Sequence, residues 1–150
     1  MKEEYRSARE KLERIKELDD DICILMERCR EVRRKIFWNS FSNRMTANYG
    51  IAGGGHHLPE SGWTEINIKQ YLNLSKWLSE KEAERDAIID IIQLVKGYRK
   101  KLLYYRYVKG ETWENVAAGI NVSLRGVHRE HIKALKEFCC IIKKREQCHK

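Results

Sequence analysis

The stretch RYVKGETWENVAAGINVSLRGVHREHIKAL, residues 106–135, contains the most informative structural pattern of this chain. Gly110 is suited to end one helix, and Thr112 is suited to cap the start of the next. After a tight turn, Ser123 is placed to cap a longer helix. Two helices joined by a short turn, with the small Ala117 where they cross, are typical of a helix-turn-helix module.

This stretch resembles region 4 of bacterial sigma-70-type factors and, more closely, phage late-gene transcription activators of the RinA/ArpU type. The matching positions are Arg106, Tyr107, Val108, Gly110, Trp113, Glu114, Val116, Ala117, Ser123, Val127, Arg129, Ala134 and Leu135. The likeness covers residues 98–138, and it departs from the family at Gly126 (usually threonine) and Asn121 (usually glycine). It implies a sequence-specific regulator that binds double-stranded DNA, in the manner of a phage or prophage late-operon activator.

The first turns of the helix after Ser123 are expected to enter the major groove, because a recognition helix reads base edges there. The residues opposite Val127 that would face the bases are Leu124, Arg125, His128 and Arg129. Arginine can read guanine through two hydrogen bonds, worth roughly 1–3 kcal/mol, and leucine can contact a thymine methyl. At the start of the preceding helix and further along, we expect phosphate contacts from Lys109, Thr112, His131 and Lys133. Ser123, which begins the recognition helix, is a further DNA-binding candidate. The alternative for the two arginines is a solvated helix face.

The distribution of charge agrees with binding to a polyanion. The chain has a formal net charge of +8, yet residues 1–95 sum to −1 and residues 96–150 sum to +9. A basic module on a neutral support is typical of nucleic-acid binders. A basic tail that only promotes solubility is the alternative.

The rest of the chain predicts an all-α fold, with one proline in 150 residues. We expect a long amphipathic helix (1–38), a flexible glycine-rich loop (39–66), a second long helix (67–95) and the helix-turn-helix domain (96–150). The acidic run at residues 19–21 favours a local irregularity or a break in the first helix. The two long helices pack as an antiparallel hairpin, or they pair with other copies as in a coiled coil, giving a homodimer or a higher homo-oligomer.

A second class of function is an adaptor that binds RNA polymerase or a phage packaging component through the hairpin, without sequence-specific DNA reading. An enzyme is not expected, because no nucleophile–base pair or paired carboxylates rise above chance. The weak candidates for a metal-dependent nuclease are His56, His57 and Glu60. We expect no cofactor.

Metal binding and membrane insertion are not expected either. The five cysteines lack the spacing of a zinc site, and their number makes no even disulfide framework. No apolar run approaches the roughly 18–20 residues of a membrane span, and the first residues contain no apolar segment typical of a signal peptide. We therefore expect a protein of the bacterial host cytoplasm.

Overall fold

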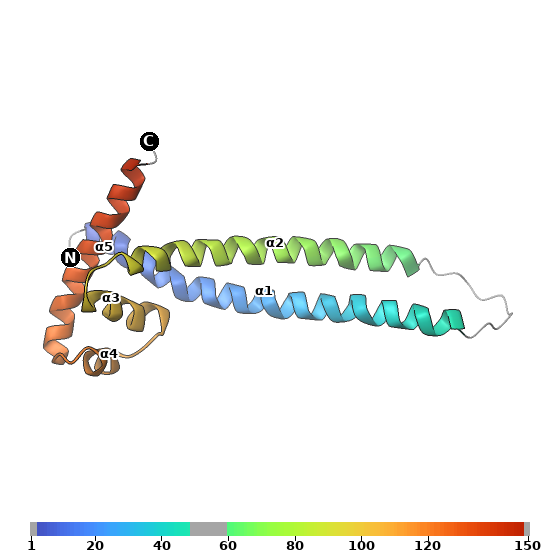
Figure 1. Cartoon of the computed structure of the whole chain (residues 1–150), viewed down its shortest axis with the longest axis horizontal. Coiled ribbons are helices and arrows are strands. Elements are labelled where there is room, and N and C mark those ends of the chain that lie inside the picture. Colours follow the sequence, from blue (N-terminus) through green and yellow to red (C-terminus); the bar gives the residue numbers. More distant parts are fainter. Residues whose placement is uncertain (1–2, 49–59, 149–150) are drawn as a thin grey trace. The chain divides into compact units, whose positions relative to one another are not determined.

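The structure, a computed structural model, describes residues 3–48 and 60–148, and every regular element in these ranges is a helix (Figure 1). The all-α prediction is therefore confirmed. The helices are α1 (Glu3–Asn48), α2 (Glu60–Gln93), α3 (Tyr98–Leu103), the π-helical turn η1 (Tyr104–Val108), α4 (Trp113–Gly119) and α5 (Leu124–Cys148). None of the described helices is long and apolar enough to cross a bilayer.

The chain forms two compact units, and the long helices α1 and α2 contribute to both. The first unit comprises residues 1–20 and 82–150, and the second comprises residues 21–81. The helix-turn-helix domain was expected to span residues 96–150. The first unit contains these residues together with the start of α1 and the end of α2.

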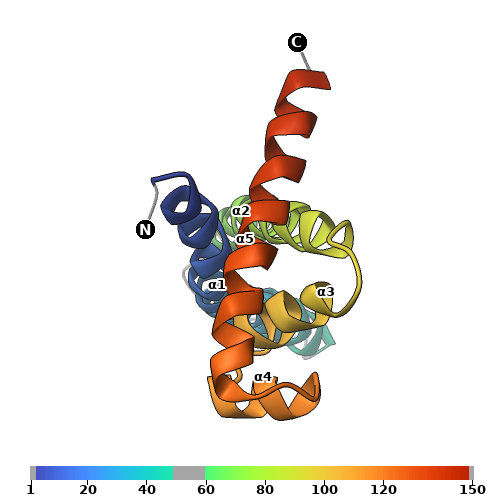
Figure 2. The ribbon, with the colours of Figure 1, turned by 90° about the vertical axis from the view of Figure 1, so that its left-hand side faces the viewer.

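The core of the first unit explains this division. Leu12 and Ile15 of α1, together with Ile92 at the end of α2, belong to one hydrophobic cluster with Leu103 and Phe138. All five side chains are inaccessible to solvent. Figure 2 shows α5 crossing this unit, with α3 and α4 beside its first half. Since a short helix-turn-helix buries little apolar surface alone, α1 and α2 supply part of the core that holds it.

The second unit is an antiparallel pair made of the later part of α1 and the earlier part of α2. Ile22, Val32 and Leu74 are buried in it. Lys81 and Asp21 form an ion pair of 2.8 Å, which fixes the register of the two helices. Many large apolar side chains of this unit remain exposed.

Both long helices extend into the predicted loop (39–66). The first helix was expected to end at residue 38, but it continues to Asn48 because neither glycine nor proline interrupts the sequence before residue 50. The second begins at Glu60, directly after the only proline in the sequence. The acidic run at residues 19–21 does not break α1. The predicted loop residues 49–59, including His56 and His57, lie outside the described residues.

Candidate nucleic-acid interface

Side-chain hydroxyls that accept hydrogen bonds from the backbone cap the start of both helices of the module. The Thr112 hydroxyl accepts a hydrogen bond from the backbone N–H of Asn115 at 3.3 Å, and the Ser123 hydroxyl accepts one from the N–H of Gly126 at 3.1 Å. Each bond satisfies a backbone donor that the first helical turn leaves without a partner. Both predicted caps are therefore confirmed.

Residues with positive φ make the chain reversals around α4. Gly110 has φ 69° before α4, and Asn121 has φ 56° in the turn that leads to α5. Asparagine tolerates this left-handed conformation, which L-residues with larger side chains rarely adopt. The N–H of Val122 then donates to the carbonyl of Ala117 at 3.0 Å, which closes the turn.

Four of the predicted contact residues lie together on the outer side of α5. Leu124, Arg125, His128 and Arg129 are exposed and spread over about 140° of the helix. Val127, on the opposite side, is fully buried. Arg125 and Arg129 make no hydrogen bond or ion pair with any other residue that the structure describes. Two guanidinium groups without ion-pair partners are thus available in the first turns of α5.

His131 differs from the sequence expectation. It was predicted to reach a phosphate, but it is half-buried and its Nε2 lies 2.9 Å from the Tyr107 hydroxyl. Its ring also packs edge-on against Trp113, with centroids 4.8 Å apart. Burial, followed by the charges of Arg9, His128 and Arg106, lowers the pKa of His131 to about 4. At neutral pH the imidazole of His131 is therefore uncharged and packed against its neighbours. We do not include His131 among the residues that could contact DNA.

The two predicted lysine contacts are both exposed, but their surroundings differ. Lys133 forms a 2.6 Å ion pair with Glu130. Lys109 follows the π-helical turn η1 and makes no ion pair within the described ranges. Trp113 is half-buried, with the Arg106 guanidinium 4.6 Å from its ring centroid.

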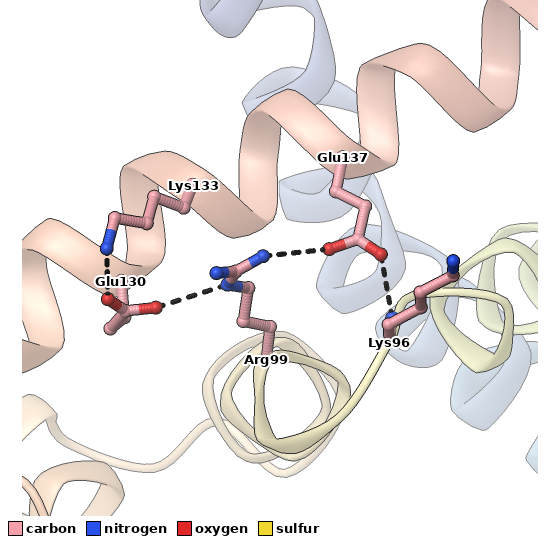
Figure 3. A network of polar contacts seen from close by, with 5 residues as sticks. All are labelled: Lys96, Arg99, Glu130, Lys133 and Glu137. Atoms are coloured by element: carbon pink, nitrogen blue, oxygen red, sulfur yellow. Dashed lines mark hydrogen bonds and ion pairs between the residues drawn. The ribbon is translucent and has the colours of Figure 1, made fainter.

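A network of ion pairs joins α5 to α3, and the sequence analysis missed it (Figure 3). Arg99 bridges Glu130 (3.1 Å) and Glu137 (3.3 Å), and Glu137 also accepts a hydrogen bond from the backbone N–H of Lys96 at 2.8 Å. The available signal was the spacing of Glu130, Lys133 and Glu137, which places all three on one side of α5. Their partner lies about thirty positions earlier in the sequence, so helical periodicity alone could not identify it.

Electrostatics favour the ionised network. The Glu130 side chain is only 13% exposed, and its pKa is lowered to about 2 by hydrogen bonds from Lys133, Tyr98 and Arg99. Glu130 therefore keeps its negative charge throughout the neutral and mildly acidic range. It restrains α5 on the side next to the outward-facing arginines, which limits the rotation of the helix.

A groove of about 750 Å³ lies beside this surface, within the first unit. Its cationic lining residues are Arg9, Lys16, Arg106 and Lys109, and its carboxylates are Glu13 and Asp19. Arg9 pairs with Glu13 at 2.7 Å, and Asp19 pairs with Arg85 at 3.3 Å. Lys16 and Lys109 make no ion pair with a described residue, so the groove lining adds positive charge near His128.

Within residues 3–48 and 60–148, no three His, Cys, Asp or Glu side chains gather in a way that could hold a metal ion. Comparison with protein-family models, curated proteins and solved structures gives no match for this chain. The chemistry that the described site offers is therefore that of a rigid, cationic helix surface with two capped helix starts.

Proposed function

We propose that this protein is a sequence-specific regulator that binds double-stranded DNA in the bacterial host cytoplasm, as a phage or prophage late-operon activator does. The single observation that carries the proposal is the outer side of α5, where Arg125 and Arg129 project without partners among the described residues. A cationic helix held by capped turns and a fully buried Val127 can enter a major groove without rearranging.

Three further features support this proposal. Residues 96–150 carry a net charge of +9, which favours association with a polyanion. Thr112 and Lys109 lie at the start of α4, where backbone N–H groups and positive charge suit a phosphate. We infer the role in transcription regulation from the resemblance to RinA/ArpU-type activators.

The test is fluorescence anisotropy with labelled duplexes, comparing the region upstream of the gene for this protein with a random sequence. We expect tighter binding to the upstream duplex and a log–log salt slope of roughly −4 to −5. Arg125→Ala and Arg129→Ala should each cost about 1–3 kcal/mol on the cognate duplex and relax its discrimination. Equal binding to both duplexes without salt dependence would contradict the proposal.

Arg30→Ala is the matched control. Arg30 is also exposed and also lacks an ion pair with any described residue, but it lies on α1 in the second unit. We expect its replacement to leave the discrimination between duplexes unchanged. An equal loss of affinity in all three variants would indicate non-specific attraction rather than base reading.

A second candidate function is an adaptor for RNA polymerase, and the exposed aromatic residues at the far end of α1 favour it. Phe37 and Phe41 are exposed on the second unit. A pull-down with purified RNA polymerase tests this role without DNA. Binding that is lost in Phe37→Ala and retained in Arg125→Ala would favour the adaptor over the DNA reader.

A further inference from the structure

One side of the second unit is apolar at both ends. On α1, Ile24 and Trp38 are 14 residues apart, which brings them to the same side of the helix about four turns from each other. On α2, Ile66 and Trp77 are 11 residues apart and likewise share a side. More than half of each of these four side chains is exposed. We call this set the paired-tryptophan surface.

The two helices present these residues on the same side of the pair. Ile24 and Trp77 line one hollow of about 260 Å³, together with Leu25 and the ion-paired Asp21 and Lys81. Because Trp38 lies on the Ile24 side of α1, and Ile66 lies on the Trp77 side of α2, all four face one way. An apolar cavity of about 150 Å³ admits a benzene ring, so this hollow can receive a larger aromatic side chain.

We propose that a second copy of this chain covers the paired-tryptophan surface, antiparallel to the first, in a two-fold symmetric dimer of the hairpins. In such an interface, residue i of one copy meets residue j of the other, and j meets i. A two-fold axis at the level of Glu31 places Trp38 opposite Ile24 of the second copy. Each Trp38 then enters the hollow of the other copy.

The pattern of α2 fits the same axis independently. The midpoint between Ile66 and Trp77 falls between residues 71 and 72. The ion pair of Asp21 with Lys81 fixes the register of the pair and places this level of α2 beside residue 31 of α1. One axis therefore pairs Ile66 with Trp77 of the second copy as well.

The polar residues between the apolar ends are complementary under this axis. Glu27 falls opposite Lys35 of the second copy, and Gln70 falls opposite Asn73. On the axis, Glu31 faces Glu31 of the second copy. Arg28 lies one turn away on the same side of α1, where its positive charge can compensate the two glutamates. The Glu27–Lys35 and Gln70–Asn73 pairs are thus complementary across the interface, and such pairs fix the register of specific interfaces.

The available area is also sufficient. The helices overlap over about 22 residues of α2, or roughly 33 Å, and two adjacent helices are about 20 Å wide. A face of this size buries roughly 650 Å² on each copy, or about 1,300 Å² in total. Stable interfaces bury about 1,200–2,000 Å².

The first test is sedimentation equilibrium of the full chain, and it needs no DNA, so it is independent of the proposed function. We expect a dimer for the wild type and at least a roughly 100-fold rise in the dimer Kd for Trp38→Ala, because the contact occurs twice. Phe37→Ala is the matched control. The two aromatic side chains are similarly exposed (Phe37 71%, Trp38 69%), but Phe37 lies on a different side of α1, away from the proposed interface. Its Kd should change less than about 3-fold. Circular dichroism checks that each variant stays helical.

Charge exchange tests the antiparallel register. Glu27→Lys and Lys35→Glu should each weaken self-association, whereas an equimolar mixture of the two variants should form a heterodimer in which both pairs are again of opposite charge. A wild-type monomer at 100 µM, a dimer that depends on Phe37 but not on Trp38, or a mixture that does not recover would each overturn the proposal.

Discussion

Replacing Glu130 by glutamine should loosen α5 from α3. The change removes the carboxylate that bonds Arg99 at 3.1 Å and Lys133 at 2.6 Å, while keeping the shape of the side chain. Hydrogen bonds to charged groups contribute about 1.5–3 kcal/mol when shielded, and exposed ion pairs contribute about 0.2–1 kcal/mol. Because both cations are partly exposed, we expect Glu130→Gln to lower the free energy of unfolding by about 1–2 kcal/mol at pH 7.

The size of this loss should depend on pH. The pKa of Glu130 is lowered from 4.5 to about 2 in the folded protein, first by the hydrogen bond from Lys133. Its stabilising contribution is therefore complete above pH 4.5, and it is lost as the pH falls towards 2, because the unfolded chain takes up the proton first. The difference between wild type and Glu130→Gln should shrink across that window.

The assay is urea denaturation followed by circular dichroism, at pH 7 and at several values below 4.5. Glu146→Gln is the control, since Glu146 is 66% exposed and its ion pair with Lys11 is long, at 3.5 Å. We expect that control to cost less than about 0.5 kcal/mol. Equal losses for Glu130→Gln and Glu146→Gln at pH 7, or a loss for Glu130→Gln that is the same at pH 7 and pH 3, would refute the reasoning.

Three other perturbations test the first unit. Thr112→Ala removes the cap of α4 and should cost about 1 kcal/mol in urea denaturation, with Thr112→Ser retaining most of it. Leu12→Ala should cost about 2–5 kcal/mol and destabilise the helix-turn-helix, as measured by hydrogen exchange in α5, whereas Val32→Ala in the second unit should leave that exchange nearly unchanged. The lowered pKa of His131 means that the unfolded chain binds a proton first, so stability should fall between pH 6.5 and about 4, and His131→Gln should flatten that slope in thermal denaturation.

Most of the local architecture could be predicted from the sequence. Thr112 and Ser123 are confirmed as caps, and Asn121 adopts the left-handed turn, because each depends on neighbours only a few positions away. The side of α5 that carries Arg125 and Arg129 also follows from helical periodicity around Val127. The helix ends were less predictable, since polar residues near a loop do not by themselves stop a helix that lacks glycine or proline.

Local pattern determined the helices, their caps and the direction in which the arginines of α5 point. Three features depend on tertiary packing and could not be predicted. Leu12 of α1 shares a core with Phe138, His131 turns inward to Tyr107, and Arg99 restrains α5 through Glu130. The reason is physical: helix formation depends on residues three or four positions apart, whereas burial and ion pairing depend on which distant segments meet. Which segments meet depends on the packing of the whole unit.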